Sequence, residues 1–567
     1  MGCASKGPAA HEKLMKFYLS TLLVALALLF QEAGAQGTLR PNLLIIIADD
    51  LGSYSDLSAF GSEIQTPNLD GFVREGLVFN SFYVAPTCSP TRAMLFSGTD
   101  PHLAGLGTMD ELRYASPQPA GTLGYEGHLN FNVVTIADVL RGAGYRTYLS
   151  GKWHLGHSDD NNPATRGFER SFALLDGAAS HYDQTGIKSD IAKARYREDG
   201  RSVDLPAEFK YSSDFFTDKL MTYLDGHDRD TAPFFAVLGF TAPHWPLQAP
   251  QEDIDNYRGV YDRGWEAIRA QRVAGLRRLG VIEDDHYDSG HEAGWRRWDD
   301  LDDATRARET KLMQIYAAMV SRLDWNVGRL MDYLRTHGLD RNTYVFFMSD
   351  NGAEGNDPRP VRGVGGWVDS DHFDNRYENL GKAGSFAWLS PEWAHVSSTP
   401  YRLFKGFTTE GGIRVPLLVR RAAVSVNDDQ AQTVGQVFNA TDLTATLAAL
   451  GGIDHWPTLH DGRPVASLAG TPIGPILGRA GHVDVDKVVA RELFGRKSLR
   501  RGDWKILWIE PPKGAGRWQL YNVKADPAEA HDLAAAEPRR LSELTALWDR
   551  YAVQNNIRAG GAGGYGK

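Results

Sequence analysis

The sequence predicts an α/β protein built on a large, mostly parallel sheet, because buried strands and amphipathic helices alternate along it. Continuous apolar runs rich in β-branched and aromatic residues are typical of strands buried on both faces of a parallel sheet. Two stretches between such runs, 134–141 and 312–334, carry apolar residues at helical spacing and predict helices that cover the sheet. Four apolar runs predict strands, and each ends in a polar cluster: 43–48, 145–149, 234–240 and 344–348.

With 567 residues, the chain is long enough for one large domain and a smaller one. We expect a main domain over residues 36–485 and a C-terminal α+β subdomain over 486–567, where short strands alternate with Pro- and Gly-rich turns. The charged, Trp-containing stretch 252–308 predicts a helical insertion, which either walls a ligand cleft or is a surface addition. The antiparallel strands expected in the subdomain are 488–493, 504–509 and 518–523.

The N-terminus has the pattern of an export signal. Three lysines precede the apolar run 17–30, and Ala33-Gly34-Ala35 then gives an A-x-A cleavage pattern. The run has 14 residues, fewer than the roughly 20 that a membrane span needs, so we favour a signal peptide over residues 1–35 to a membrane anchor. Translation could also start at Met15, since the segment from there is a complete signal. We therefore expect a periplasmic or secreted protein without a stable membrane anchor.

Composition limits the classes of partner. Apolar residues make up 42% and charged residues 23% of the chain, as in ordinary folded proteins. The formal net charge of −10 disfavours a nucleic-acid partner, which would need a basic surface. A small anionic ligand is still compatible with this charge, because a site can be locally positive on an acidic protein.

One cysteine stands out. Of the two in the chain, Cys3 lies in the predicted signal, so the exported protein keeps only Cys88 and has no internal disulfide. A lone cysteine is ordinarily a small buried hydrophobe. The polar neighbours Ser89-Pro90-Thr91-Arg92 favour a chemical role instead.

Acidic and amide side chains follow two of the predicted strands. Asp49 and Asp50 come after the first run, and Asp350 and Asn351 come shortly after the fourth. The carboxyl ends of parallel strands meet at one edge of a sheet, and close carboxylates are costly unless a cation neutralises them. Oxygen ligands favour calcium or magnesium over zinc, and no zinc motif is present. Helix capping is the alternative role, but the four residues together predict a metal site.

Cationic side chains follow the other two strands. Lys152 and His154 come after the second run, His244 comes after the third, and Arg92 and Lys405 lie in segments that can reach the same edge. Each alone could be a structural histidine or a solvated surface cation. Together with a divalent metal they suit a tetrahedral oxyanion. Because no G-x-S-x-G motif is present, the set predicts transfer of a sulfuryl or phosphoryl group.

Residues 87–92 (TCSPTR) fit the C-x-P-x-R signature of type I sulfatases, and the continuation 93–98 fits as well. On this basis the chain resembles the formylglycine-dependent sulfatase family over roughly residues 41–533. The other family-like stretches are 41–50, 151–156, 349–352, 398–416 and 520–533. Three stretches resemble the bacterial arylsulfatases of the Pseudomonas type: 98–100, 105–109 and 124–129.

The resemblance implies an alkaline-phosphatase-like fold and a defined chemistry. In this family the signature cysteine, here Cys88, is oxidised to formylglycine (3-oxoalanine), whose hydrate is a gem-diol. One hydroxyl attacks the sulfur of a sulfate ester and releases the alcohol or phenol, which leaves a covalent sulfo-enzyme intermediate. Loss of the second hydroxyl proton re-forms the aldehyde and releases sulfate. The implied activity is that of an arylsulfatase acting on a small organic sulfate ester, with a formylglycine-generating enzyme as maturation partner.

The resemblance also assigns the metal ligands. One calcium ion, rather than magnesium, would be held by Asp49, Asp50, Asp350 and Asn351 and by the modified residue at Cys88. Asp350 is in addition a candidate for activating the attacking hydroxyl.

The remaining roles fall to the cations. Arg92 and Lys152 would orient the diol, and His154 would take the proton from the second hydroxyl. His244 and Lys405 would bind sulfate, and either could protonate the leaving oxygen. Two other interpretations stay open: a phosphonate monoester or phosphodiester hydrolase on the same scaffold, and a non-catalytic binding protein. The last predicts loss of a site residue, yet all matched positions are intact.

Overall fold

A mixed sheet forms the centre of the structure, a computed structural model that describes residues 1–2, 40–115, 118–119, 121–227, 232–283, 292, 294–422, 432–478 and 486–558. In the middle of the sheet, β1 (Asn42–Asp49) pairs in parallel with β10 (Thr343–Ser349) and with β9 (Phe234–Pro243). On its other side β9 pairs in parallel with β3 (Arg146–Lys152). These four strands correspond to the four predicted runs, so the prediction of a large, mostly parallel α/β sheet is confirmed.

Towards its edges the sheet becomes mixed. β4 (Arg170–Leu174) continues the parallel order beyond β3, whereas β11 (Arg414–Arg420) runs antiparallel between β10 and β2 (Leu77–Tyr83). Over the described residues the strand order is β12-β2-β11-β10-β1-β9-β3-β4-β7-β8, with β13 also on β2. The outermost strands are short: β12 (Gln432–Val434), β13 (Phe438–Asn439), β7 (Tyr196–Glu198) and β8 (Arg201–Val203).

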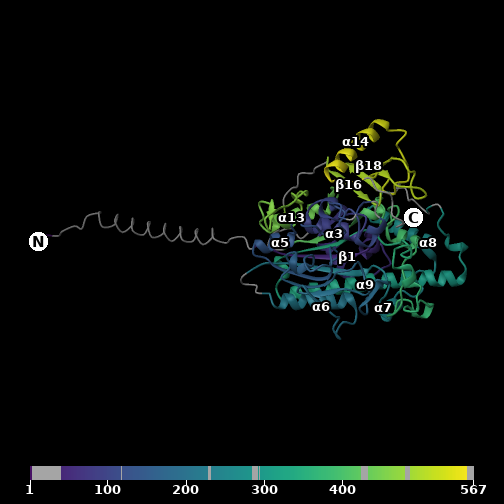
Figure 1. Cartoon of the computed structure of the whole chain (residues 1–567), viewed down its shortest axis with the longest axis horizontal. Coiled ribbons are helices and arrows are strands. Elements are labelled where there is room, and N and C mark those ends of the chain that lie inside the picture. Colours follow the sequence, from purple (N-terminus) through teal and green to yellow (C-terminus); the bar gives the residue numbers. More distant parts are fainter. Residues whose placement is uncertain are drawn as a thin grey trace. The chain divides into compact units, whose positions relative to one another are not determined.

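Helices cover both faces because the side chains of β1 alternate between two apolar cores. Leu44 and Ile46 belong to one core, and Ile45 and Ile47 belong to the other, as the two-residue period of a strand requires. Figure 1 shows helices on both sides of β1. The first core is closed by α2 (Pro67–Glu75), α6 (Ser212–Asp225) and α9 (Asp303–Thr336). The second is closed by α3 (Cys88–Ser97), α5 (Ile136–Gly142) and α13 (Ala440–Leu450).

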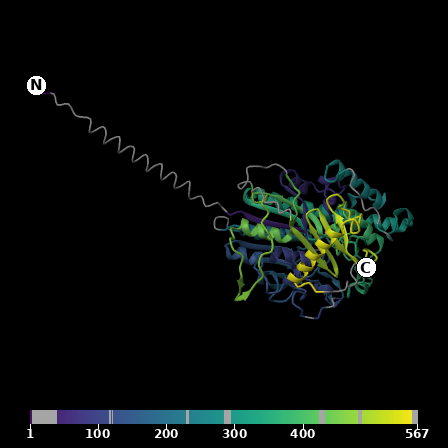
Figure 2. The same ribbon diagram turned by 90° about the horizontal axis from the view of Figure 1, so that it is seen from above.

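The C-terminal part forms a second, antiparallel sheet. Its strands are β16 (Val488–Leu493), β17 (Arg496–Arg501), β18 (Trp504–Trp508) and β19 (Gln519–Asn522). Helix α14 (Pro538–Gln554), yellow in Figure 2, covers this sheet. Its Trp548 packs in one cluster with Leu499 and Ile506. The predicted antiparallel sheet is confirmed, while the domain boundary at 485/486 stays a prediction.

The charged stretch 252–308 is helical where the structure describes it. It contains most of α7 (Gln251–Asp255), all of α8 (Gly264–Arg278) and the start of α9. Trp265 and Trp298 are buried, with ring centroids 4.9 Å apart, and both pack on Trp393 at 5.9 and 6.0 Å. These tryptophans fasten the segment to the main core. Whether it also walls a ligand cleft stays a prediction.

The remaining α-helices and strands of the described residues are short and lie mostly in the connections, as do the 3-10 helices, among them Asp110–Ala115. These α-helices and strands are α4 (Pro101–Ala104), α10 (Gly365–Val368), α11 (Pro391–Ser397), α12 (Glu410–Ile413), β5 (Thr185–Lys188), β6 (Ile191–Lys193), β14 (Leu459–His460) and β15 (Arg463–Pro464).

The predicted signal peptide lies outside the described residues, apart from Met1 and Gly2, and so does the Gly-rich C-terminal segment 560–567. In the part of the chain that the structure describes, no helix combines the length and the apolar character needed to cross a membrane. Cleavage after Ala35 stays a prediction.

We predict that Arg272 of α8 is a main support of the fold. The residue is fully buried, and its guanidinium lies 2.6 Å from both Asp56 and Glu63. Arg272→Met leaves these carboxylates without their cation, so the free energy of unfolding should fall by about 3 to 5 kcal/mol. Urea unfolding followed by tryptophan fluorescence measures the change. Arg278→Met, at an exposed position on the same helix, is the control, and equal effects of the two substitutions would contradict the prediction.

Candidate active site

The predicted site residues come together at the carboxyl ends of the central strands. Asp49 closes β1, Lys152 closes β3 and His244 directly follows β9. Because β9 lies between β1 and β3, these three strand ends meet at one edge of the sheet. Asp350 and Asn351 follow β10, the neighbour of β1 on the other side.

The acidic residues form a buried cluster with lysines. Oδ2 of Asp49 lies 2.7 Å from Nζ of Lys152, and Oδ1 of Asp50 lies 2.8 Å from Nζ of Lys405. The side-chain amide of Asn351 donates to Oδ1 of Asp50 at 2.6 Å. All five residues are at most 1% exposed. Charges so deeply buried are tolerated only when they are closely paired.

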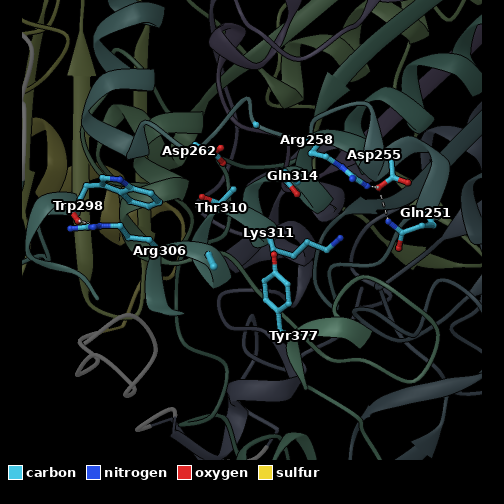
Figure 3. A pocket seen from close by; sticks show the side chains of 12 residues that line it. Gln251, Asp255, Arg258, Asp262, Trp298, Arg306, Thr310, Lys311, Gln314 and Tyr377 are labelled. Atoms are coloured by element: carbon cyan, nitrogen blue, oxygen red, sulfur yellow. Dashed lines mark hydrogen bonds and ion pairs between the residues drawn. The ribbon is translucent and has the colours of Figure 1, made fainter. Parts of the chain in front are cut away.

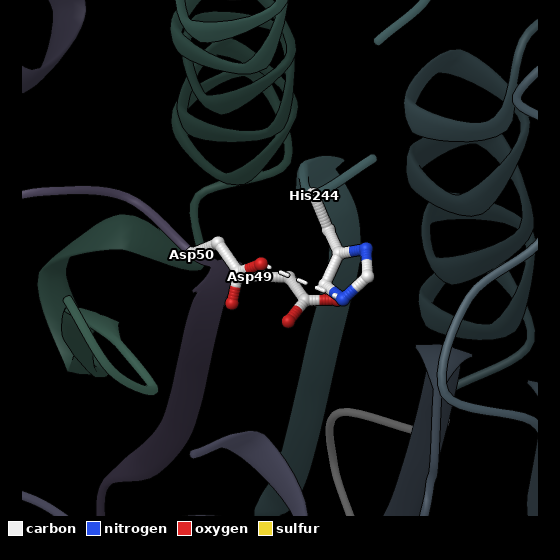
Figure 4. A group of neighbouring side chains, drawn as sticks. All are labelled: Asp49, Asp50 and His244. Atoms are coloured by element: carbon white, nitrogen blue, oxygen red, sulfur yellow. Dashed lines mark ion pairs between the residues drawn. The ribbon is translucent and has the colours of Figure 1, made fainter. Parts of the chain in front are cut away.

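Part of this cluster is suited to a metal ion. Ligand atoms of Asp49, Asp50 and His244 all lie within 4.8 Å of one another (Figure 4). Oδ1 of Asp49 and Oδ1 of Asn351 are buried without a hydrogen-bond partner among the described residues. Burial raises the pKa of Asp49 to about 7 and that of Asp50 to about 8, although the nearby lysines lower both. A divalent cation would satisfy both oxygens and supply the charge that keeps the carboxylates ionised.

Asp350 and His244 flank this group. Asp350 accepts hydrogen bonds from the backbone N–H of Asp50 at 3.4 Å and from Nε of Arg92 at 2.9 Å. Nε2 of His244 lies 3.5 Å from Oδ2 of Asp50, and Nδ1 lies 2.6 Å from the backbone oxygen of Trp245. Since Nδ1–H donates to that oxygen, neutral His244 presents a lone pair on Nε2. His244 can therefore serve as a metal ligand, a role that the sequence did not indicate.

Cys88 is the first residue of α3, where the free backbone N–H groups of the helix favour negative charge. Its Sγ lies 3.4 Å from Nδ1 of His154, and the residue is 1% exposed. Burial raises the pKa of the thiol, but Lys152, Lys405 and His154 outweigh burial and lower the pKa to about 7. An anionic atom on residue 88 is therefore stabilised.

Arg92, one turn further along α3, links the helix that begins at Cys88 to the sheet. Nη1 of Arg92 donates to the backbone oxygen of Lys152 at 2.8 Å, and Nε donates to Asp350. Nη2 is buried and has no hydrogen-bond partner among the described residues. This leaves a guanidinium donor available for an oxyanion beside Cys88.

Two acidic residues of the site carried no signal in the sequence. Oε1 of Glu111 lies 2.8 Å from Nε2 of His154, and Oε2 of Glu354 lies 3.3 Å from Nζ of Lys405. Burial lowers the pKa of His154, but the opposing effect of Glu111 and Cys88 is larger and raises it to about 9. The family-like stretch 105–109 ends two residues before Glu111, so only its neighbourhood was indicated.

One side of Cys88 is apolar. The residue belongs to a buried cluster that includes Met109, Leu112, Trp245 and Phe386. The ring centroids of Trp245 and Phe386 are 5.5 Å apart. An organic group attached to an anion at this site would meet mostly carbon on that side.

A separate cavity of about 610 Å³ lies between α7, α9 and Tyr377 (Figure 3). None of the predicted site residues lines it. Its Arg258 side chain is 79% exposed and pairs with Asp255 at 2.9 Å, so this cation is largely solvated. The cavity is therefore not the site to which the sequence motifs point.

The fold and the site together define a hydrolase of tetrahedral oxyanion esters. Residues 41–453 match the family model described as Sulfatase, and the chain belongs to the sulfatase family. It is accordingly a sulfuric ester hydrolase. Membership implies, in general terms, a metal ion and a formylglycine residue.

Two relatives support this family. The chain is 40% identical over 531 residues to an uncharacterized sulfatase of Schizosaccharomyces pombe, and the match covers 91% of this chain and 94% of that protein. It is 36% identical over 475 residues to the arylsulfatase of Klebsiella aerogenes, and the match covers 82% of this chain and 95% of that protein.

Solved structures share the fold. Ps i-CgsB in complex with k-i-k-neocarrahexaose gives a TM-score of 0.63 at 24% identity, with 91% of this chain and 93% of that chain covered. The phosphonate monoester hydrolase of Agrobacterium radiobacter gives a TM-score of 0.54 at 18% identity, with 91% of this chain and 96% of that chain covered. At these identities the likeness concerns the fold alone.

We predict that Asp50 is needed for cation binding. Asp50→Asn removes a charged oxygen ligand and should weaken calcium binding by at least about tenfold, since changes beyond the direct ligands of a metal already cost that much. Titration calorimetry on chelator-treated protein measures the affinity. Asp369→Asn, at an exposed position, is the control. Unchanged calcium affinity in Asp50→Asn would remove Asp50 from the metal site.

Proposed function

We propose that this protein is a calcium-dependent arylsulfatase whose nucleophile is formylglycine formed from Cys88. The placement of Cys88 supports this proposal most strongly. It stands at the N-terminus of α3, within 3.4 Å of His154, and Lys152 and Lys405 both act on its thiol. A plain thiolate would form a thiosulfate that lacks an easy exit, whereas a gem-diol forms an intermediate that can expel sulfate.

In the proposed first step, a hydroxyl oxygen of the hydrated aldehyde takes the place of Sγ. Arg92 and Lys152 orient this oxygen and favour its ionised form, and Asp350 helps to remove its proton. The oxygen bonds to sulfur while the bond from sulfur to the ester oxygen breaks. The departing alcohol or phenol takes a proton from Lys405, because neutral His244 offers only the lone pair of Nε2 to the site. Residue 88 then carries the sulfate as a covalent ester.

In the second step, His154 and Glu111 release the sulfate. Glu111 accepts the Nε2–H of His154, so the neutral form of His154, which acts in this step, presents the Nδ1 lone pair to residue 88. Nδ1 takes the proton of the remaining hydroxyl, the carbonyl double bond re-forms and the bond from carbon to the sulfate oxygen breaks. Water then hydrates the aldehyde and restores the diol.

The metal completes the proposed site. Asp49, Asp50, Asp350 and Asn351 would hold it together with residue 88, and His244 is placed to join them. When bound, calcium would polarise a sulfate oxygen and balance the negative charge of the carboxylates. The predominance of oxygen donors favours calcium, with magnesium as the other candidate.

The apolar side of the site favours phenols and apolar alcohols as the organic part of the ester. Trp245, Phe386 and Leu112 lie in the same buried cluster as Cys88 and offer contact area to a ring. The alternative is a phosphonate monoester or phosphodiester hydrolase. This alternative stays open because the phosphonate monoester hydrolase of Agrobacterium radiobacter shares the fold.

We further propose that the chain is exported and that a formylglycine-generating enzyme modifies it before it folds. Cys88 is 1% exposed and opens a helix whose residues are all buried. A modifying enzyme needs an extended, accessible segment, so conversion fits the unfolded chain.

The experiment that tests this function compares three substrates. Protein co-expressed with a formylglycine-generating enzyme is assayed on 4-nitrophenyl sulfate, 4-nitrophenyl phosphate and a phenylphosphonate monoester. We expect preference for the sulfate, and a loss of at least about 1000-fold in Cys88→Ala, because the nucleophile is gone. Peptide mass spectrometry should find an aldehyde at position 88. Preference for the phosphonate would favour the alternative, and an active Cys88→Ala variant would refute the formylglycine mechanism.

We also predict that Glu111 acts mainly in sulfate release. Glu111→Gln removes the charge that stabilises protonated His154, so kcat should fall by roughly 100-fold or more. Because the first step is spared, rapid mixing should show a burst of phenol, and mass spectrometry should find the sulfated residue 88. Asp110→Asn, at the neighbouring and partly exposed position, is the control. A slow variant without a burst would place Glu111 outside the release step.

A further inference from the structure

A second cavity, of about 420 Å³, is lined by arginines and has no residue in common with the proposed active site. Arg414 of β11 and Arg500 of β17 line it, together with Tyr401 from the segment that leads to Lys405. Tyr401 is 5% exposed and Arg500 is 7% exposed, so their polar groups are largely shielded from bulk water. We call this cavity the Arg414–Arg500 pocket.

The arginines have hydrogen-bonding capacity to spare. Arg500 donates from Nε to the backbone oxygen of Gly502 at 2.8 Å and from Nη1 to the hydroxyl of Tyr83. No hydrogen bond joins Nη2 of Arg500 to any residue that the structure describes. Nη2 of Arg414 donates to Oγ of Ser81 at 3.2 Å, which uses one of its two hydrogens. A ligand with several acceptor oxygens would use these donors.

The charges of the ion-paired group beside the pocket do not cancel. Lys505 lies 2.9 Å from Glu410 and 2.8 Å from Glu529, while Arg414 and Arg500 lie 3.3 and 4.0 Å from Glu410. Within this group three cations share two carboxylates and leave one positive charge, whereas the other charged lining residues, Lys524, Glu283 and Asp503, are exposed and screened by water. A buried excess charge is costly, so an anion bound beside the arginines is stabilised.

The rest of the lining decides which anion fits. Apolar side chains and a solvent-exposed cation at Lys524 contribute to it, and the two acidic residues of the lining, Glu283 and Asp503, are exposed. A ligand with one compact anionic head and an apolar body matches this division. The apolar part of the lining includes Leu276, Val281, Ile282, Val523 and Pro527.

We propose that the Arg414–Arg500 pocket binds a small organic oxyanion, in which a sulfonate, sulfate, phosphate or carboxylate group sits on a compact apolar body. The head accepts hydrogen bonds from Arg414, Arg500 and the Tyr401 hydroxyl, and the body contacts the apolar lining. This binding does not depend on formylglycine or on turnover.

The probe for this site is 4-bromobenzenesulfonate, which has no ester bond to cleave. In crystals of the full chain soaked with it, we expect anomalous scattering from bromine in the pocket, and calorimetry should detect a binding event there. Arg500→Met should weaken this event roughly 10- to 100-fold, because it removes a charged donor. Arg501→Met, at the next and largely exposed position of β17, is the control. Inorganic sulfate and phenol, tested separately, distinguish binding by the head alone from binding by the body alone.

Several outcomes decide the proposal. Bromine at the active site only, or equal affinity in Arg500→Met and Arg501→Met, overturns it. Binding of phenol as tight as that of the sulfonate also overturns it, because the arginines would then contribute nothing. If Arg500→Met fails to fold, the position of bromine in the wild-type crystal decides. Competitive inhibition of sulfate ester hydrolysis reports the active site separately, so an inactive protein with bromine in the pocket would refute only the arylsulfatase proposal.

Discussion

The structure depends on the burial of opposite charges at the end of β1. Asp49 and Asp50 have almost no contact with solvent, and no apolar residue could take their place in binding a cation. Lys152 reaches Asp49 from β3, and Lys405 reaches Asp50 from a loop more than 350 residues further along the chain. The central sheet must therefore be complete before these pairs can form. Conversely, without these ion pairs the two buried aspartates would be too costly to keep charged at this edge of the sheet.

Because the site is buried, the modification of Cys88 and catalysis belong to different states of the chain in the proposed pathway. Cys88 opens α3 inside the assembled site, where His154, Arg92 and the lysines surround it. These contacts suit an oxyanion at residue 88 but leave no access for a large modifying enzyme. In the proposed pathway, oxidation precedes folding and the folded protein then protects the aldehyde from competing reactions. In this proposal, the burial of Cys88 explains why oxidation has to come before folding.

The sequence predicted the parts of the molecule that local pattern determines. The central strands were visible as apolar runs, and their topology explains why Asp49, Lys152, His244 and Asp350 meet at one edge. Glu111 could not be predicted, because it lies on a short 3-10 helix and reaches His154 only through tertiary packing. The ligand role open to His244 has the same origin, since spacing along the chain does not reveal which nitrogen faces which carboxylate. The main role of Trp265 was also hidden, because a charged stretch gave no sign that its tryptophans pack on Trp393.

The net charge of the site favours sulfate monoesters over phosphate monoesters as substrates. In their ordinary charged forms, the carboxylates around the site outnumber Arg92 and the two lysines by two: Asp49, Asp50, Asp350, Glu111 and Glu354. Because the release step needs neutral His154, a bound divalent cation would bring the site close to neutrality. A sulfate monoester then adds one negative charge, whereas a phosphate monoester at neutral pH adds close to two and is disfavoured more strongly. Phosphonate monoesters also carry one charge, so the apolar surface beside Cys88, rather than electrostatics, has to distinguish them from sulfate esters.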